Sequence, residues 1–421
     1  MHNFERYSQH TILGLVCIAA ALFPFSVAAT NAALGLALAM GLVSGHLWKG
    51  MQLFASEFRP LALAFAALVL LAAVSLTWSL DPALGLRKIG REWLLLLVPL
   101  LLYCFRQERQ RDAILIALSI GLGLHLVYCV LQAFGLAHPV TDGSSQEDPA
   151  GLIGHIGFGF VYGLWAGWLI HAAIRLQGWQ RWAVLALAGW AIVMIFLGQG
   201  RAGYVVAMAI LLSVTWKELI HLANKRYILL AAVVLLLAGS AAVLSSGAKE
   251  RLELSWQQLE AARAGNLQGT EARFGLWLAA WEAWKSSPWF GSGTGGYYKA
   301  GKAAIEKHPT YGYNGDPYSH PHNMYLLSMV RWGLVGLLVL ISLLAIWIRT
   351  GWRLDWRISS AGCLIGLSGL ALAVNGLTSS SFEEHFPSIL SMLFLGLGLA
   401  AASEEKSLSR GQPRPDATDV A

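Results

Sequence analysis

The chain has 421 residues, of which 56% are hydrophobic and 13% are charged. A soluble globular protein carries about 25% charged residues, so this chain has too little polar surface to face water on all sides. The formal net charge of +6 does not indicate nucleic-acid binding, because the basic residues lie in short clusters between apolar runs and form no continuous basic face. The composition therefore indicates an integral membrane protein.

Apolar runs long enough to cross a bilayer recur along the chain, since a spanning helix needs about 20 mostly apolar residues. Lipid leaves no partner for free backbone groups, so we expect helices and an all-α polytopic fold. The first run ends in Val27-Ala28-Ala29, but we interpret it as a permanent span, because only Arg6 precedes it and a second run follows at once. The sequence predicts about twelve spans, at 11–29, 31–48, 60–79, 92–105, 113–136, 151–174, 182–199, 202–220, 227–245, 324–348, 358–378 and 386–402.

Lysine and arginine set the expected orientation. With the N-terminus in the cytoplasm, most basic residues outside the one long hydrophilic segment fall in connections on the cytoplasmic side, as at 106–111 and 349–357. Both termini are then cytoplasmic. The predicted organisation is nine helices within 1–245, a large periplasmic helical loop at 246–323, three helices within 324–402 and a disordered cytoplasmic tail at 403–421.

The large loop contains a predicted helix at 271–286 with tryptophans at positions 277, 281 and 284. This spacing places Trp277, Trp281 and Trp284 on one helical face. The face is either an aromatic belt or the core of the loop, or else a shelf for sugar rings. The glycine-rich segment 290–296 that follows is either a plain turn or a nest of N–H groups for an anion; it lacks the Lys-Ser/Thr ending of a nucleotide-binding loop.

Two arginines and a cationic cluster are candidates for binding an anionic headgroup. Arg201 lies among glycines in the tight connection 198–204, as a membrane-boundary anchor or as a fixed cation that grips phosphate through its fork. Arg273 begins the tryptophan-bearing helix, where a surface ion pair is the alternative. Arg87, Lys88 and Arg91 lie on the predicted external side between the third and fourth spans, as attractors of a lipid diphosphate or as headgroup anchors.

The segment Ser319-His320-Pro321-His322-Asn323 returns the loop to the membrane. Proline stiffens the backbone between the histidines, and Asn323 is placed to cap the next helix. A neutral imidazole suits general-base work near pH 7. Metal binding is the rival interpretation, with Asp316, Glu383, Glu384 and His385 as further ligands, but no zinc-like spacing occurs. The four cysteines lie in apolar runs, as expected of packing residues.

Three motifs occur in a fixed order around the loop. They are Gly-Gln-Gly-Arg-Ala-Gly at 198–203, Arg273 with the helix leading to Ser-Pro-Trp-Phe-Gly-Ser-Gly at 287–293, and His-Pro-His-Asn-Met-Tyr-Leu at 320–326 followed by Arg-Trp-Gly-Leu-Val-Gly at 331–336. Together they resemble the O-antigen ligase and polymerase superfamily, most specifically over about 190–340. The ligase branch is the closer match.

The resemblance implies a bacterial inner-membrane, GT-C-like glycosyltransferase with a periplasmic active site. It would move O-antigen polysaccharide from undecaprenyl diphosphate to lipid A–core oligosaccharide during lipopolysaccharide biosynthesis. Arg201 and Arg273 match the family's diphosphate-binding arginines, His322 matches its essential histidine, and His320 takes a less constrained place. The family pattern assigns no role to the cluster at 87–91.

The donor is already activated, because diphosphate is a good leaving group. A sugar hydroxyl would attack the anomeric carbon while His322 takes the proton and Arg201 and Arg273 neutralise the departing diphosphate. We therefore expect an inverting, metal-independent transfer without a cofactor, and the catalytic residues are these three. The predicted substrate contacts are Arg201, Arg273, Arg87, Lys88, Arg91, His320, Asn323, Trp277 and Trp281.

Other functions remain open at this point. An O-antigen polymerase or a protein O-oligosaccharyltransferase would use the same lipid-linked donor with another acceptor. A glycolipid transporter would form no new bond, and it would be expected to show inverted repeats or charges in mid-bilayer. The spans are nearly free of charge, with Arg331 in the tenth as the exception.

Overall fold

The computed structural model describes residues 2–140, 144–198, 200–219, 272–312 and 315–410, together with Glu253, Trp256, Gln257 and Glu260. Within these ranges the regular elements are α-helices and short 3-10 helices, and no strand is present. The prediction of an all-α fold is confirmed. The predicted span 227–245, most of the loop before residue 272 and residues 411–421 of the predicted tail lie outside the described residues. Residues 403–409, predicted to be part of a disordered tail, instead belong to the last helix, which ends at Ser409.

The helices in the first half of the described chain follow the order of the predicted spans. The second and the fourth of these spans differ from the prediction. Gly45 adopts a left-handed φ of 77°, which only a residue without a Cβ adopts freely, so the second span stops at residue 43 and the chain turns by 86°. The fourth span is short and starts as a 3-10 turn. The elements are α1 (His2–Leu22), α2 (Val27–Val43), α3 (His46–Glu57), α4 (Arg59–Val74), η1 (Ser75–Trp78), α5 (Pro82–Ile89), η2 (Glu92–Leu96), α6 (Leu97–Cys104), α7 (Glu108–Ala133), α8 (Gly154–Arg175), α9 (Gly178–Leu197) and α10 (Arg201–Leu219).

The second half contains the two helices of the large loop and three further apolar helices. These are α13 (Ala272–Lys285), α14 (Tyr297–Lys307), α15 (Met324–Trp352), α16 (Ala361–Asn375) and α17 (His385–Ser409). Among the described residues, six helical segments are long and apolar enough to cross a membrane, and α2 with α3 adds a bent seventh. The apolar parts of α10 and α16 are shorter. The chain is thus a multi-pass membrane protein, and the count of twelve stays a prediction.

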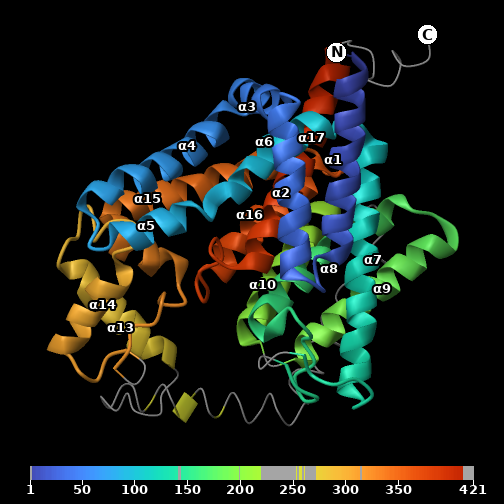
Figure 1. Ribbon diagram of the computed structural model, residues 1–421. Helices are drawn as coiled ribbons and strands as arrows, with labels where there is room; N and C mark the ends of the chain where they lie inside the picture. The colour runs from blue at the N-terminus through green and yellow to red at the C-terminus, as the bar shows by residue number, and fades with distance from the viewer. Residues whose placement is uncertain are drawn as a thin grey trace.

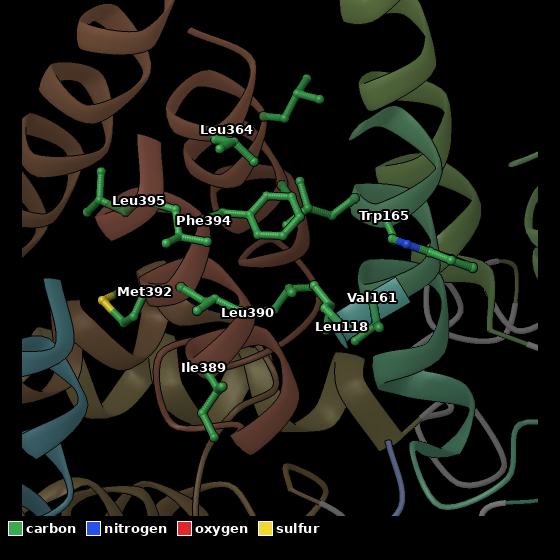
Figure 2. Close-up of a cluster of buried hydrophobic side chains, with 14 of the residues drawn as sticks. Leu118, Val161, Trp165, Leu364, Ile389, Leu390, Met392, Phe394 and Leu395 are labelled. Atoms are coloured by element: carbon green, nitrogen blue, oxygen red, sulfur yellow. The ribbon is translucent and has the colours of Figure 1, made fainter. Parts of the chain in front are cut away.

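Helix α17 lies at the centre of the bundle, with 94% of its most apolar window buried. Figure 2 shows Phe394 of α17 between Leu364 of α16 and the α8 residues Val161 and Trp165. All four side chains are fully buried. Because lipid is as apolar as a leucine side chain, close packing rather than exclusion from water stabilises such contacts.

The two ends of the bundle carry different parts of the chain (Figure 1). The start of α1 and the end of α17 lie together at one end, called here the termini end. Helices α13 and α14 lie at the opposite end, called here the loop end. A loop on the opposite side from both termini is what the predicted topology requires.

Candidate active site

The start of α15 is fixed by its asparagine cap. The Asn323 Oδ1 accepts a hydrogen bond of 2.9 Å from the Leu326 N–H, and its Nδ2 donates to the Leu377 carbonyl at 2.9 Å. The Met324 N–H donates to the Gly376 carbonyl at 2.8 Å. The predicted cap is confirmed, and both extra contacts come from the connection between α16 and α17. Asn323 thus holds the histidine pair against that connection.

His322 has a strained backbone and a free ring nitrogen. Its φ is 50°, in the left-handed region that costs a residue with a Cβ roughly 1–2 kcal/mol. Such strain is typical of functional sites. The ring of His322 lies 4.4 Å from that of His320, centroid to centroid, and the His322 N–H donates to His320 Nδ1 at 3.3 Å. The His322 Nδ1 is buried and has no hydrogen-bond partner among the described residues.

Both imidazoles are neutral at pH 7. Burial, together with the neighbouring His320 and the charge of Arg273, lowers the pKa of His322 to about 4. Burial also lowers the pKa of His320, while Glu383 opposes this shift and Lys88 and Arg331 reinforce it. A neutral imidazole with an unpaired nitrogen can accept a proton, as a general base must.

Arg273 lies in the first turn of α13, half-buried. Its charge acts on both His322 and Glu384, which places these three groups within electrostatic range of one another. Burial raises the pKa of Glu384, and hydrogen bonds from Ser379 and Ser380 and the charge of Arg273 oppose that rise. Arg273 has no ion-pair partner within the part of the chain that the structure describes, so its guanidinium is available to an anion.

Arg201 begins α10, and its side chain lies outside the described residues. The turn that carries it packs tightly on α8. A Cβ on Gly200 would lie 2.3 Å from the His155 carbonyl oxygen, and one on Gly203 would lie 2.6 Å from the Gly159 Cα. Both glycines are therefore needed for this close approach, and the turn before Arg201 is fixed by packing. Whether Arg201 faces His322 stays a prediction.

The three cations of the α5 region separate into two kinds. Lys88 is mostly buried, and its Nζ lies 2.5 Å from Glu383 Oε2. Arg87 and Arg91 are exposed and form no ion pair with any described residue. Arg87 and Arg91 can therefore attract an anion from solution, whereas Lys88 already has a carboxylate partner.

Lys88, Glu383 and Arg331 form a buried charge cluster, with side-chain exposures of 16%, 15% and 7%. Arg331 of α15 pairs with the other oxygen of Glu383. Burial opposes ionisation of Glu383, but the two cations outweigh it and hold its pKa at about 2. The sequence marks Arg331 as a lone charge in an apolar span, which requires a counter-charge. It does not identify Glu383, for which we considered only a metal-binding role.

A cavity lies beside this cluster, between α4 and α15. The cavity has a volume of about 50 Å³. Its wall is apolar except at the end formed by Glu92, Glu383, Arg331 and two serines. There Ser328 Oγ, Ser380 Oγ and Arg331 Nε are buried without a hydrogen-bond partner among the described residues. Buried polar atoms are normally paired, so this end of the cavity suits a polar group or ordered water. The other lining residues are Leu68, Val69, Ala72, Leu95, Met324, Leu327, Trp332, Leu340 and Phe382.

The three tryptophans of α13 do not share one environment. Trp284 donates from Nε1 to the Pro288 carbonyl at 3.0 Å and packs with α14, as expected for the core of the loop. Trp281 is 45% exposed and its ring lies 4.7 Å from that of Trp284. Trp277 is half-buried, and its Nε1 has no partner within the described chain. Trp277 and Trp281 are therefore the two indoles left for a sugar.

The glycine-rich turn 290–296 is a docking element for α15. Gly333 breaks α15 with a φ of 65°. The freed carbonyls of Val330 and Arg331 each accept a bond of 2.8 Å, from the Ser292 and Gly293 N–H groups. The Thr294 N–H donates to Ser75 Oγ at 3.1 Å. Because these N–H groups are already used within the protein, the plain-turn interpretation holds and the anion nest does not.

The described residues include no group of three His, Cys, Asp or Glu side chains that could hold a metal ion. His320, His322 and Glu383 come near one another, but Glu383 is occupied by two cations. The four cysteines are free, and three of them are buried. Metal-independent transfer stays a prediction.

Comparison with known proteins agrees with the motifs. A family model described as O-antigen ligase matches residues 183–341. The match runs from α9 into α15 and includes Arg201, Arg273, both histidines and Arg331. No curated protein matches the chain. The resemblance recognised from the sequence is thereby confirmed: in this multi-pass membrane protein, residues 183–341 match the O-antigen ligase family, which supports a glycosyltransferase role.

Proposed function

We propose that the chain is an O-antigen ligase, which transfers a polysaccharide from undecaprenyl diphosphate to a hydroxyl of lipid A–core oligosaccharide. One observation carries the proposal: the unpaired Nδ1 of a strained His322 lies in electrostatic range of Arg273, a cation without a carboxylate partner among the described residues. Glycosyl transfer from a diphosphate donor needs a base for the proton of the acceptor hydroxyl and a cation for the departing diphosphate. The family match over 183–341 supports the same assignment.

Arg273 and Arg201 are assigned to the diphosphate. A guanidinium stays charged at all relevant pH values and binds phosphate oxygens in pairs, which a lysine cannot reproduce. Arg87 and Arg91, exposed on α5 and just after it, would attract the headgroup from the membrane surface. Cations aimed at the leaving group stabilise the charge that develops as its bond breaks.

His322 is assigned as the general base. The acceptor hydroxyl oxygen forms a bond to the anomeric carbon, the bond from that carbon to the diphosphate oxygen breaks, and the hydroxyl proton passes to His322. The lipid diphosphate departs with the electron pair, and attack from the opposite face inverts the anomeric centre. A pKa of about 4 makes His322 a weak base in the empty site. A bound diphosphate anion would raise this pKa, so the base becomes effective when the donor is present.

We place the loop end in the periplasm and the chain in the bacterial inner membrane. The termini end carries the basic residues that the positive-inside rule assigns to the cytoplasm. Lys49, Arg111 and Lys406 belong to this group, and they contact Glu5, Glu404 and the Glu57 carbonyl respectively. The apolar wall of the cavity between α4 and α15 supports a lipid substrate that enters from the side of the bundle.

A reconstituted assay tests the function directly. The purified chain in vesicles receives a polyprenyl-diphosphate-linked glycan and one acceptor at a time: lipid A–core, a second lipid-linked glycan, or a protein acceptor. We expect product only with lipid A–core. Product with the second lipid-linked glycan would instead identify a polymerase, and product with the protein a protein-glycosylating enzyme. Movement of glycolipid across the vesicle without a new bond would identify a transporter.

The same assay with a chelator tests metal independence. We expect undiminished transfer, because the arginines supply the positive charge that a divalent ion provides in metal-dependent transferases. Activity that the chelator removes and a divalent ion restores would contradict this assignment.

A further inference from the structure

Residues 322–332, which are the last two residues before α15 and its first nine residues, are held at both ends by the connection between α16 and α17. At its start, the Gly376 carbonyl accepts from the Met324 N–H, and the Leu377 carbonyl accepts from Asn323 Nδ2. At its far end, Glu383 of the same connection pairs with Arg331. These residues, called here the histidine strut, thus contact the same short connection at both ends, and His322 is their first residue.

The far end of the strut also contacts η1, directly after α4, and α5. This set of contacts is called here the junction. The Trp332 Nε1 donates to Thr294 Oγ1 at 2.8 Å and to Ser75 Oγ at 3.1 Å. Glu383 extends the junction, because its second oxygen binds Lys88 of α5 at 2.5 Å. One carboxylate therefore joins three elements: the strut, α5 and the α16–α17 connection.

Stability alone does not account for this arrangement. Burying an ion pair costs desolvation energy, and apolar residues of similar volume often serve stability equally well or better. The arrangement here is moreover incomplete, since Arg331 Nε, Ser328 Oγ and Ser380 Oγ have no partner among the described residues. What the cluster does fix is a distance. One carboxylate binds a cation of the strut and a cation of α5, so it sets how far apart these two elements lie.

We propose that Glu383 is a positioning residue for glycosyl transfer, which sets the place of His322 relative to α5 by holding Arg331 and Lys88 at once. This inference rests on the proposed function. Glu383 touches neither substrate in the proposal; it acts through the strut and α5. Displacing a reacting group by about 1 Å can cost roughly 10²-fold in rate, so loss of the carboxylate should reduce turnover without removing a substrate contact.

The decisive variant replaces the Arg331–Glu383 pair by apolar residues of similar volume, as Arg331→Met with Glu383→Leu. It leaves the charge of Lys88 in place. The matched control is Arg111→Met with Glu404→Leu, because Arg111 and Glu404 form a second buried pair, with a nitrogen–oxygen distance of 2.7 Å, at the termini end. Removal of Glu383 leaves Lys88 without a carboxylate, so the melting temperature of the site variant should fall. Its kcat, measured well below that temperature, should fall by about 10²-fold. The KM for the donor should not rise, and the control should keep wild-type kcat.

Two further measurements keep the test decisive. Hydrogen exchange across 318–332 should be faster in the site variant than in wild type, and the control should leave this segment unchanged. If the double variant does not accumulate, the single variants Glu383→Asp and Glu383→Gln replace it: the aspartate should restore most of kcat, and the glutamine should not.

A site variant with kcat within about threefold of wild type and unchanged exchange would overturn the proposal. Equal losses of kcat in the aspartate and glutamine variants would overturn it as well. Failure of the proposed function looks different, because the wild-type chain itself would then form no product with lipid A–core, while the exchange experiment would still report whether Glu383 holds the strut.

Discussion

The two buried arginine–glutamate pairs at opposite ends of the bundle have the same chemistry and different surroundings. At the termini end, the Arg111 Nη2 lies 2.7 Å from Glu404 Oε2, and its Nη1 donates to the Phe105 carbonyl at 3.2 Å. At the loop end, Arg331 pairs with Glu383 and lines a cavity, and its Nε has no hydrogen-bond partner among the described residues. The pair at the termini end is called closed here, because backbone carbonyls accept further hydrogen bonds from its arginine. The pair at the loop end is called open, because its arginine keeps a nitrogen without a partner among the described residues.

This difference separates a structural role from a working one. The closed pair joins α7 to α17. The open pair is accompanied by two neutral imidazoles, one of which belongs to a residue with a strained backbone. Groups held in unfavourable environments concentrate at functional sites. The loop end is therefore where substitutions should change catalysis, and the termini end is where they should change stability only.

The largest expected effect is at His322. His322→Ala should lower kcat by about 10²- to 10⁴-fold, because the general base is lost. His322→Asn is the sharper variant, since asparagine tolerates a left-handed backbone and removes the base alone. Glycan transfer by the purified variants, compared with their thermal stability, measures the effect.

The matched control lies at the termini end. His46→Ala removes a buried histidine that is hydrogen-bonded to Ser8 at 2.9 Å, and it should leave turnover unchanged. Full activity of His322→Asn would remove the proposed base and with it the contrast between the two ends.

Arginine-to-lysine changes should come next. Arg273→Lys and Arg201→Lys keep the charge but lose the fork that binds two phosphate oxygens. We expect kcat/KM for the donor to fall by roughly 10- to 10²-fold. The exposed Arg357, paired with Asp355, serves as control, and Arg357→Lys should have no effect. Unaltered kcat/KM in Arg201→Lys would instead favour the membrane-anchor interpretation of that residue.

The pH profile tests the neutral state of the loop-end histidines. Because His322 must be unprotonated and its pKa is lowered to about 4, kcat/KM should be independent of pH from about 6 to 8 and fall as pH drops through about 4. The sign for stability is the same. Between about pH 6.5 and 4 the unfolded chain binds a proton that the folded site does not. The free energy of unfolding therefore decreases as the pH is lowered from about 6.5 to 4. An acid limb near pH 6.5 would show that burial does not control this group.

The smallest expected effect is at the exposed indole of the loop. Trp281→Ala should raise the KM for the sugar acceptor by a few-fold to about tenfold, the scale of one aromatic contact, and leave kcat unchanged. Trp179 is 77% exposed on α9, outside the loop end, and Trp179→Ala provides the control. An unchanged acceptor KM would assign the α13 tryptophans to the core of the loop or to the membrane interface.

Sequence patterns predicted the helices well and their ends less well. Apolar runs identified the long apolar helices, because a bilayer imposes length and composition on any segment that crosses it. They did not predict α5, α14 or most of α3. They did not foresee the 86° turn at Gly45 or the break of α15 at Gly333. Both depend on a left-handed glycine, and at Gly333 the freed carbonyls are bonded by residues about 40 positions earlier in the chain. Apolar periodicity carries no signal of such distant partners.

The sequence by itself determined the all-helical membrane fold, the capped start of α15 and the family of residues 183–341, because each depends on local composition or on motifs of a few residues. Only the tertiary structure decided which charges are free. Lys88 and Arg87 are neighbours in sequence, yet one is buried on Glu383 and the other is exposed. That division arises from packing of α5, α15 and the α16–α17 connection around one carboxylate, since a buried charge needs a partner and an exposed one has water.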